Sequence, residues 1–232
     1  MKSLLSFLFF ILFIYPNLIF AQSVKLNKLI FEPVFGYSEL NLNDSFYRLK
    51  NDDSIQFQTL KFYISKIEFI NNEETVWKEN KSFHLMDGND KKSLSIQLTI
   101  PTNIIYTSLK FNIGIDSITN ISGAMGGDLD PTKGMYWTWQ SGYINFKIEG
   151  KSNLCKTRNN EFQFHIGGYQ YPFNCLQIVK LNCKQSDQIK INIDVSKFLD
   201  KVDLSKQNHI MSPSNESVLL SNKLLNAFSI NK

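Results

Sequence analysis

The chain has 232 residues, 43% of them hydrophobic, and a formal net charge of +4. This length and apolar content are sufficient for one domain with a hydrophobic core of its own. The lysines are spread along the sequence without a basic block, which argues against nucleic acid as a partner. The sequence also lacks Gly-x-Ser-x-Gly, His-Glu-x-x-His, Walker and Rossmann motifs. We therefore expect a binding protein rather than an enzyme.

The first 21 residues have the pattern of a secretory signal peptide. Lys2 precedes an almost wholly apolar run, Leu4–Phe20, and the small residue Ala21 follows it. A membrane anchor is the alternative, but the run is marginal for crossing a bilayer and contains Pro16. We predict cleavage after Ala21, a single mature domain of residues 22–232 without a membrane span, and a periplasmic or secreted location.

The mature chain is dominated by short runs in which apolar and polar residues alternate. Such alternation is typical of strands with one buried face, and its spacing predicts an all-β fold, an antiparallel β-sandwich or barrel-like domain. A short helix is expected at the C-terminal end, where the cap Ser212-Pro213-Ser214 precedes apolar residues at helical spacing. The predicted strands cover residues 26–34, 55–70, 93–100, 108–115, 143–148, 162–166, 176–181 and 189–195.

The three cysteines stand in an exported chain, where disulfides persist. Cys175 and Cys183 bracket one predicted strand, which separates them by roughly 26 Å, whereas a disulfide needs Cα atoms within about 7 Å. A hairpin between the strands at 162–166 and 176–181 would place Cys155 opposite Cys183. We therefore predict a Cys155–Cys183 disulfide and a free thiol at Cys175.

A long loop, about residues 116–134, separates two of the predicted strands and contains three aspartates. Long ordered loops often carry function. Clustered carboxylates suit calcium, but Asp-Pro followed by Lys-Gly is ordinary turn chemistry. We favour the turn interpretation, in which Asp116, Asp128 and Asp130 anchor the loop.

The loop leads directly into an aromatic segment that contains Trp137 and Trp139. Two residues apart on a strand, these side chains point to the same face. From the residues alone, both are best interpreted as large core residues. Gly142 would then mark a bulge that turns them toward the core.

The same segment resembles the signature of the MbnP family. Its block Gly-Met-Tyr-Trp-Thr-Trp-Gln-Ser-Gly-Tyr-Ile, residues 134–144, is specific to that family. Similar blocks occur in the same order elsewhere, so the resemblance covers nearly the whole mature chain. They are LKFYISKIEFI at 60–70, LKFNIGIDS at 109–117, FHIGGY at 164–169 and HIMSP at 209–213.

The resemblance implies a periplasmic or secreted β-sandwich that binds copper. It also implies a di-haem cytochrome c peroxidase-like (MauG-like) partner that oxidises a tryptophan to kynurenine, for which Trp137 and Trp139 are the candidates. His165 matches the family's Phe-His-Ile-Gly position. Imidazole suits copper and thioether suits Cu(I), so we predict a copper site formed by His165, His209 and Met211.

Two simpler interpretations stay open. His165 would otherwise be a sheet residue satisfied by a neighbour, and Met125, Met135 and Met211 would fill gaps in the core. His84 is the least favoured of the three histidines as a ligand. The alternative function is a metal-free periplasmic or surface β-sandwich that binds a protein or a glycan through its aromatic loop.

Overall fold

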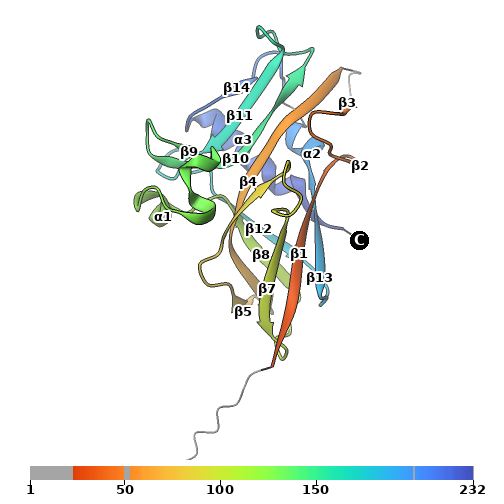
Figure 1. Ribbon diagram of the computed structural model, residues 1–232, viewed down its shortest axis with the longest axis vertical. Coiled ribbons are helices and arrows are strands. Elements are labelled where there is room, and N and C mark those ends of the chain that lie inside the picture. Colours follow the sequence, from red (N-terminus) through yellow and green to blue (C-terminus); the bar gives the residue numbers. More distant parts are fainter. Residues whose placement is uncertain (1–22, 50–52, 201, 232) are drawn as a thin grey trace, which may run out of the picture.

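The computed structural model describes residues 23–49, 53–200 and 202–231, whose strands form two β-sheets packed against each other (Figure 1). The predicted signal peptide, residues 1–21, lies outside this described part. Within the described ranges, no helix combines the length and apolar character that crossing a membrane requires.

The smaller sheet is built on β1 (Val24–Phe35). β13 (Gln188–Asp194) runs parallel to β1, whereas β7 (Ser95–Pro101) pairs with it antiparallel. β15 (Phe228–Ile230) and β2 (Ser38–Glu39) complete this sheet.

The larger sheet is built on β4 (Ser54–Asn71), a strand of 18 residues. Its main path runs β12 (Gln177–Asn182), β8 (Ser108–Ile113), β4, β10 (Gly142–Ser152), β11 (Glu161–Gly167) and β14 (His209–Ile210). Four short strands pair beside this path: β3 (Phe46–Arg48), β5 (Glu74–Lys78) and β6 (Phe83–Asp87) on β4, and β9 (Tyr136–Trp137) on β10.

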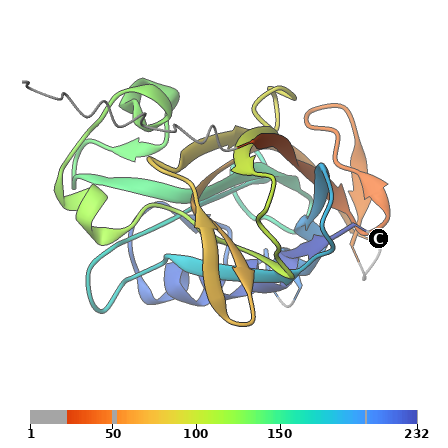
Figure 2. The same ribbon diagram turned by 90° about the horizontal axis from the view of Figure 1, so that it is seen from below.

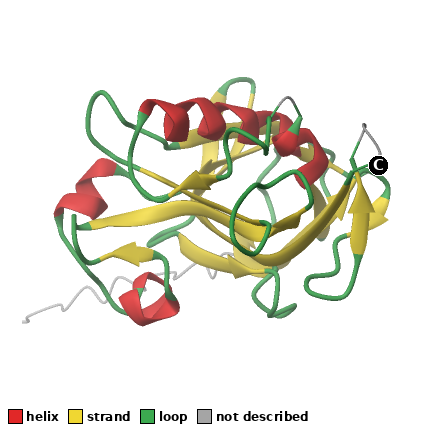
Figure 3. Cartoon of the chain, turned by 90° about the horizontal axis from the view of Figure 1, so that it is seen from above, coloured by secondary structure: helices red, strands yellow, loops and turns green. Residues whose placement is uncertain are grey.

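Three α-helices complete the described chain: α1 (Ser117–Ile121), α2 (Val195–Leu199) and α3 (Asn215–Ala227). The Ser214 hydroxyl caps α3 by accepting a hydrogen bond from the Ser217 amide. Leu220 and Leu224 of α3 are buried, and the helix packs on β11, β12 and α2. Figure 3 shows α2 and α3 side by side over one side of the strands.

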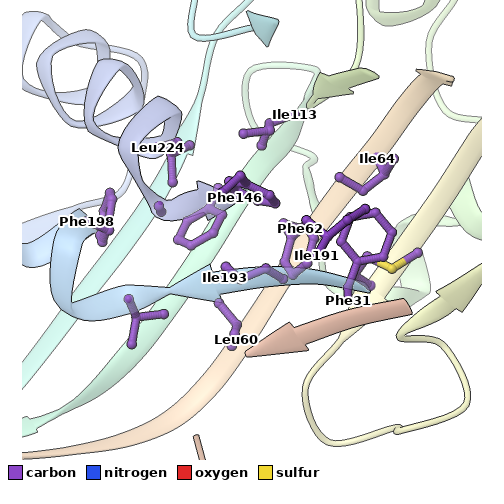
Figure 4. Packing of buried hydrophobic residues seen from close by; sticks show 14 of the residues in the cluster. Phe31, Leu60, Phe62, Ile64, Ile113, Phe146, Ile191, Ile193, Phe198 and Leu224 are labelled. Atoms are coloured by element: carbon purple, nitrogen blue, oxygen red, sulfur yellow. The ribbon is translucent and has the colours of Figure 1, made fainter. Parts of the chain in front are cut away.

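The main core lies between the two sheets and is rich in phenylalanine (Figure 4). Phe62 of β4 is fully buried, and its ring centroid lies 6.2 Å from that of Phe31 on β1. The rings of Phe146 and Phe228 each lie 5.9 Å from the same side chain. Such aromatic pairs add about 0.5–1.5 kcal/mol each to the effect of burial, so this cluster joins the sheets.

The predicted fold class, a β-sandwich-like domain with a C-terminal helix, is confirmed. The two parallel pairs, β1 with β13 and β11 with β14, depart from a purely antiparallel arrangement. They join segments far apart in sequence, whereas alternation within one strand carries no information about the direction of its neighbour.

The predicted Cys155–Cys183 disulfide is wrong, because the hairpin that it required does not form. β11 pairs with β10 on one edge and β14 on the other, so neither edge is available to β12, which pairs with β8 instead. All three thiols are free. Burial raises the pKa of Cys155 and Cys183 to about 11 each. The Cys175 thiol is buried beside the Ser217 hydroxyl, with 3.3 Å between Sγ and Oγ.

Candidate metal site and aromatic loop

The long loop covers the outer face of β4 and β10 with a second, smaller apolar cluster. Tyr63 stands on this face because its sequence neighbours Phe62 and Ile64 point into the main core. Tyr143 and Ile144 of β10 belong to the same outer cluster. Buried Leu129 and Met135 from the loop pack over them. Figure 2 places α1 and the segment around β9 at the end of the molecule opposite the C-terminus.

Hydrogen bonds from buried side chains hold the loop on this face. The Tyr63 hydroxyl donates to the Asp128 carbonyl oxygen at 3.1 Å, and burial raises the pKa of Tyr63. The Tyr143 hydroxyl donates to the Leu129 carbonyl at 3.1 Å and accepts from the Met125 amide at 3.0 Å. The Asn120 amide group donates to the Ile115 carbonyl and accepts from the Tyr143 backbone amide. The loop is therefore an ordered part of the fold.

The three loop aspartates accept hydrogen bonds from separate partners. Asp116 accepts from the Thr119 amide at the start of α1 and forms an ion pair with Lys66 at 2.9 Å. Asp128 accepts from the Leu85 amide and from Lys133.

Asp130 accepts from both the amide and the hydroxyl of Thr132, and these bonds lower the pKa of its carboxyl group. Across the described ranges, no three or more His, Cys, Asp or Glu side chains come together as a metal-binding group. The geometry accordingly gives a calcium interpretation no support.

The two tryptophans lie together but differ in burial. Their ring centroids are 6.2 Å apart, yet Trp137 is 5% exposed and Trp139 is 65% exposed. Trp137 ends β9 and belongs to the outer cluster, whereas Trp139 follows in the turn before β10. Neither belongs to the core between the sheets. A register shift in β10 lies at Ile144–Phe146 rather than at Gly142.

Trp137 lies against β11 at a glycine. A Cβ atom on Gly167 would come within 2.7 Å of the Trp137 six-membered ring. Gly167 is two residues after His165 on the same strand, so both positions belong to the outer face. The Trp137 indole N–H is buried and has no acceptor among the described residues.

His165 is buried on this outer face and bonded to a carboxylate. Its Nε2 lies 2.6 Å from an Oε1 atom of Glu149 on β10, and the His165 side chain is 7% exposed. This hydrogen bond is the main cause that lowers the pKa of Glu149 to about 2. Within the described ranges, the second ring nitrogen, Nδ1, has no hydrogen-bond partner. Orientation of a histidine by a carboxylate on one nitrogen is the common arrangement around metal ligands.

β14 brings the last of the family blocks, residues 209–213, beside β11. The parallel register pairs Gln163 with His209 and Phe164 with Ile210, and Met211 follows directly after β14. Ile210 is buried in the main core, and its strand neighbour His209 therefore faces outward like His165. His209 is exposed, Met211 is half-buried, and both line one open hollow of about 330 Å³.

The remaining sequence candidates lie elsewhere. His84 is on β6, with Nε2 2.8 Å from a Glu79 carboxylate oxygen. Met135 is fully buried in the outer cluster, and Met125 is 39% exposed on the loop. Glu149 and Gly167 were missed as site residues. Strand alternation places Glu149 on the face opposite to that of core-facing Ile148. Its closeness to His165, however, follows only from the pairing of β10 with β11.

A sequence profile of the MbnP family matches residues 23–212. Among solved structures, the fold is similar to MbnP from Methylosinus trichosporium, with a TM-score of 0.60 and 14% sequence identity over 79% of this chain and 80% of that one. A search of curated proteins gave no match. Because the profile spans most of the chain, from β1 through the α1 loop and β9–β11 to β14, the chain belongs to the MbnP family.

Proposed function

We propose that this protein is an exported copper-binding protein whose site contains His165 and Met211, with His209 as a further ligand. The observation that supports the proposal is the β11–β14 register, which pairs Gln163 with His209 and so lays the 209–211 segment along the strand that carries His165 and meets Trp137 at Gly167. Family membership supports the same assignment, since the MbnP resemblance implies copper. The export prediction adds a periplasmic or secreted location.

The residues present fit a copper ion in their chemistry. The hydrogen bond from Nε2 to Glu149 leaves Nδ1 of His165 as the atom available to a metal. A thioether such as Met211 is a soft donor that favours Cu(I), and imidazole suits either oxidation state. Bound copper would supply a redox-active centre at the protein surface. The described side chains supply the donors and hold the His165 ring in one orientation.

The tryptophan pair supports the second half of the proposal, oxidation of Trp137 or Trp139 to kynurenine by a di-haem cytochrome c peroxidase-like partner. The two ring centroids are 6.2 Å apart, and the exposed Trp139 gives a partner direct access to this pair. Trp137 contacts β11 two residues from His165, so a product formed there would adjoin the proposed copper ligands. In this proposal the protein itself performs no catalysis.

The decisive experiment is Cu(I) titration of the purified protein in competition with a chromophoric chelator. We expect one copper per chain, and loss of stoichiometric binding in His165→Ala because the buried imidazole is the anchored donor. Met211→Leu should weaken binding while it keeps the side-chain volume. Peptide mass spectrometry of residues 134–147 on protein from its own host should detect kynurenine at one tryptophan.

The matched control is His84→Ala, which also removes a histidine bonded to a glutamate but lies on β6. It should bind copper like the original protein. Equal copper binding by the His165 and His84 variants would remove His165 from the site. A protein that binds no copper, with unmodified tryptophans in a host that encodes the di-haem partner, would contradict the whole proposal.

A further inference from the structure

A separate pocket of about 210 Å³ opens beside the aromatic segment, where the turn before β10 meets the loop after β11. Its volume is below the roughly 300–1,000 Å³ of sites for drug-sized ligands, so it suits a single ring rather than a large molecule. Four aromatic rings and two glutamine amides dominate its lining: Trp137, Tyr169, Tyr171, Phe173, Gln140 and Gln170.

Three polar side chains of this pocket have no hydrogen-bond partner among the described residues. No hydrogen bond joins the side-chain amides of Gln140 and Gln170, or the Ser141 hydroxyl, to any described residue. Other glutamines in the same chain are engaged: Gln177 donates to Ser221 at 2.9 Å and Gln185 to the Ile104 carbonyl at 2.9 Å. Gln140 is moreover half-buried, so its amide is partly held in the wall of the pocket. The pocket therefore presents unused donors and acceptors to a ligand.

The two segments that supply most of the pocket lining contain no charged residue. Neither residues 134–146 nor residues 162–179 contain a Lys, Arg, Asp or Glu, although these types make up 20% of the chain. A charged ligand would lose its hydration without gaining a counter-ion here. The ligand class is thus neutral, with an apolar face for the aromatic rings and hydroxyl groups for the amides.

We infer that this pocket binds a neutral sugar ring, the pyranose unit of an uncharged glycan. A pyranose presents C–H groups on its faces and hydroxyl groups around its edge, which matches aromatic walls and amide groups. Beside the pocket, Tyr171 is 97% exposed and Trp139 is 65% exposed. Exposed rings of this kind are suited to binding further sugar units of the same glycan. The inference does not depend on copper, because none of the proposed metal ligands lines this pocket.

The test is saturation-transfer NMR of the purified protein with five neutral hexasaccharides: cellohexaose, xylohexaose, mannohexaose, maltohexaose and laminarihexaose. At least one should give transfer to its ring protons. Tyr171→Ala and Gln140→Ala should each raise its dissociation constant about tenfold or more. Tyr37→Ala is the matched control, because Tyr37 is another fully exposed tyrosine, between β1 and β2. His165→Ala should keep sugar binding, which separates this inference from the copper proposal.

Three results would overturn the inference. The first is no transfer to any of the five hexasaccharides. The second is equal weakening by Tyr171→Ala and Tyr37→Ala, which would place the contact outside the pocket. The third is selective binding of a decaproline peptide, since aromatic grooves with unpaired donors also recognise polyproline helices.

Discussion

The hydrogen bond between Glu149 and His165 links two neighbouring strands and fixes which imidazole nitrogen faces the proposed ligand. Lys147, on the same face of β10, lies 3.6 Å from the same carboxylate and also lowers its pKa. Glu149 thus stays ionised well into acid, and its charge favours a proton on Nε2 of His165. The proposed copper donor, Nδ1, is left without that proton.

This residue pair predicts a pH-dependent stability. The pKa of Glu149 is about 2 in the folded protein against an ordinary value of 4.5. A carboxyl group whose pKa is lowered by folding stabilises the protein above the unfolded value and loses that effect as the pH falls toward the folded value. Glu149→Gln should therefore cost about 1–3 kcal/mol at pH 7. The difference should disappear between pH 4.5 and pH 2.

Urea unfolding of both proteins across this pH range measures the effect. The control is Glu161→Gln on β11. Among the described residues, Glu161 forms a single ion pair, a long one of 4.0 Å to Lys151, which should contribute little. In the copper titration, Glu149→Gln should weaken affinity about 10–100-fold. A pH-independent stability difference would show that Glu149 acts through packing alone.

At the scale of elements, β11 is the strand that organises the site. Its inward side chains, Phe162, Phe164 and Ile166, fill the main core, and its outward positions hold His165 and Gly167. A glycine is required at 167 because the Trp137 ring and the Tyr143 carbonyl oxygen both occupy the space of a side chain there. The close approach of Trp137 to this strand therefore depends on one missing methyl group.

Gly167→Ala should separate Trp137 from β11. The added Cβ atom would meet both the Trp137 ring and the Tyr143 oxygen at 2.7 Å. We expect a loss of about 1–3 kcal/mol in unfolding free energy from overpacking, and a red-shifted tryptophan emission as Trp137 gains solvent.

Gly126→Ala is the matched control, since a Cβ there meets nothing within 4 Å and its φ is −93°. That variant should be neutral or slightly stabilising. Denaturation followed by fluorescence reports both quantities. An unchanged emission spectrum in Gly167→Ala would mean that Trp137 does not depend on this contact for its burial.

At the scale of the whole molecule, the fold is held by its core without a covalent link among the described cysteines. Alkylation of the unfolded, non-reduced protein should therefore label three thiols. Thermal unfolding should be the same with and without a reductant, because no loop is closed in the unfolded chain. Labelling of a single thiol would instead indicate that a disulfide is present, in contradiction to the strand register.

The strand pattern could be predicted from the sequence because burial of one face imposes alternation on each strand separately. The eight runs expected from alternation correspond to β1, β4, β7, β8, β10, β11, β12 and β13. The short strands β9 and β14 were not predicted, since two residues show no period. These two strands nevertheless position Trp137, His209 and Met211.

The family and the β-rich fold class could be derived from the sequence, and so could the candidate residues for metal and redox chemistry. How these candidates lie relative to one another depends on tertiary structure. Sequence separation does not specify the partner across a sheet edge, so the pairing of β11 with β14 was invisible in the sequence, and so was the failure of the predicted β11–β12 hairpin. That one choice of neighbour both leaves Cys155 and Cys183 unbonded and brings β14 to the edge of β11, because each edge of a strand accepts only one partner at a given position.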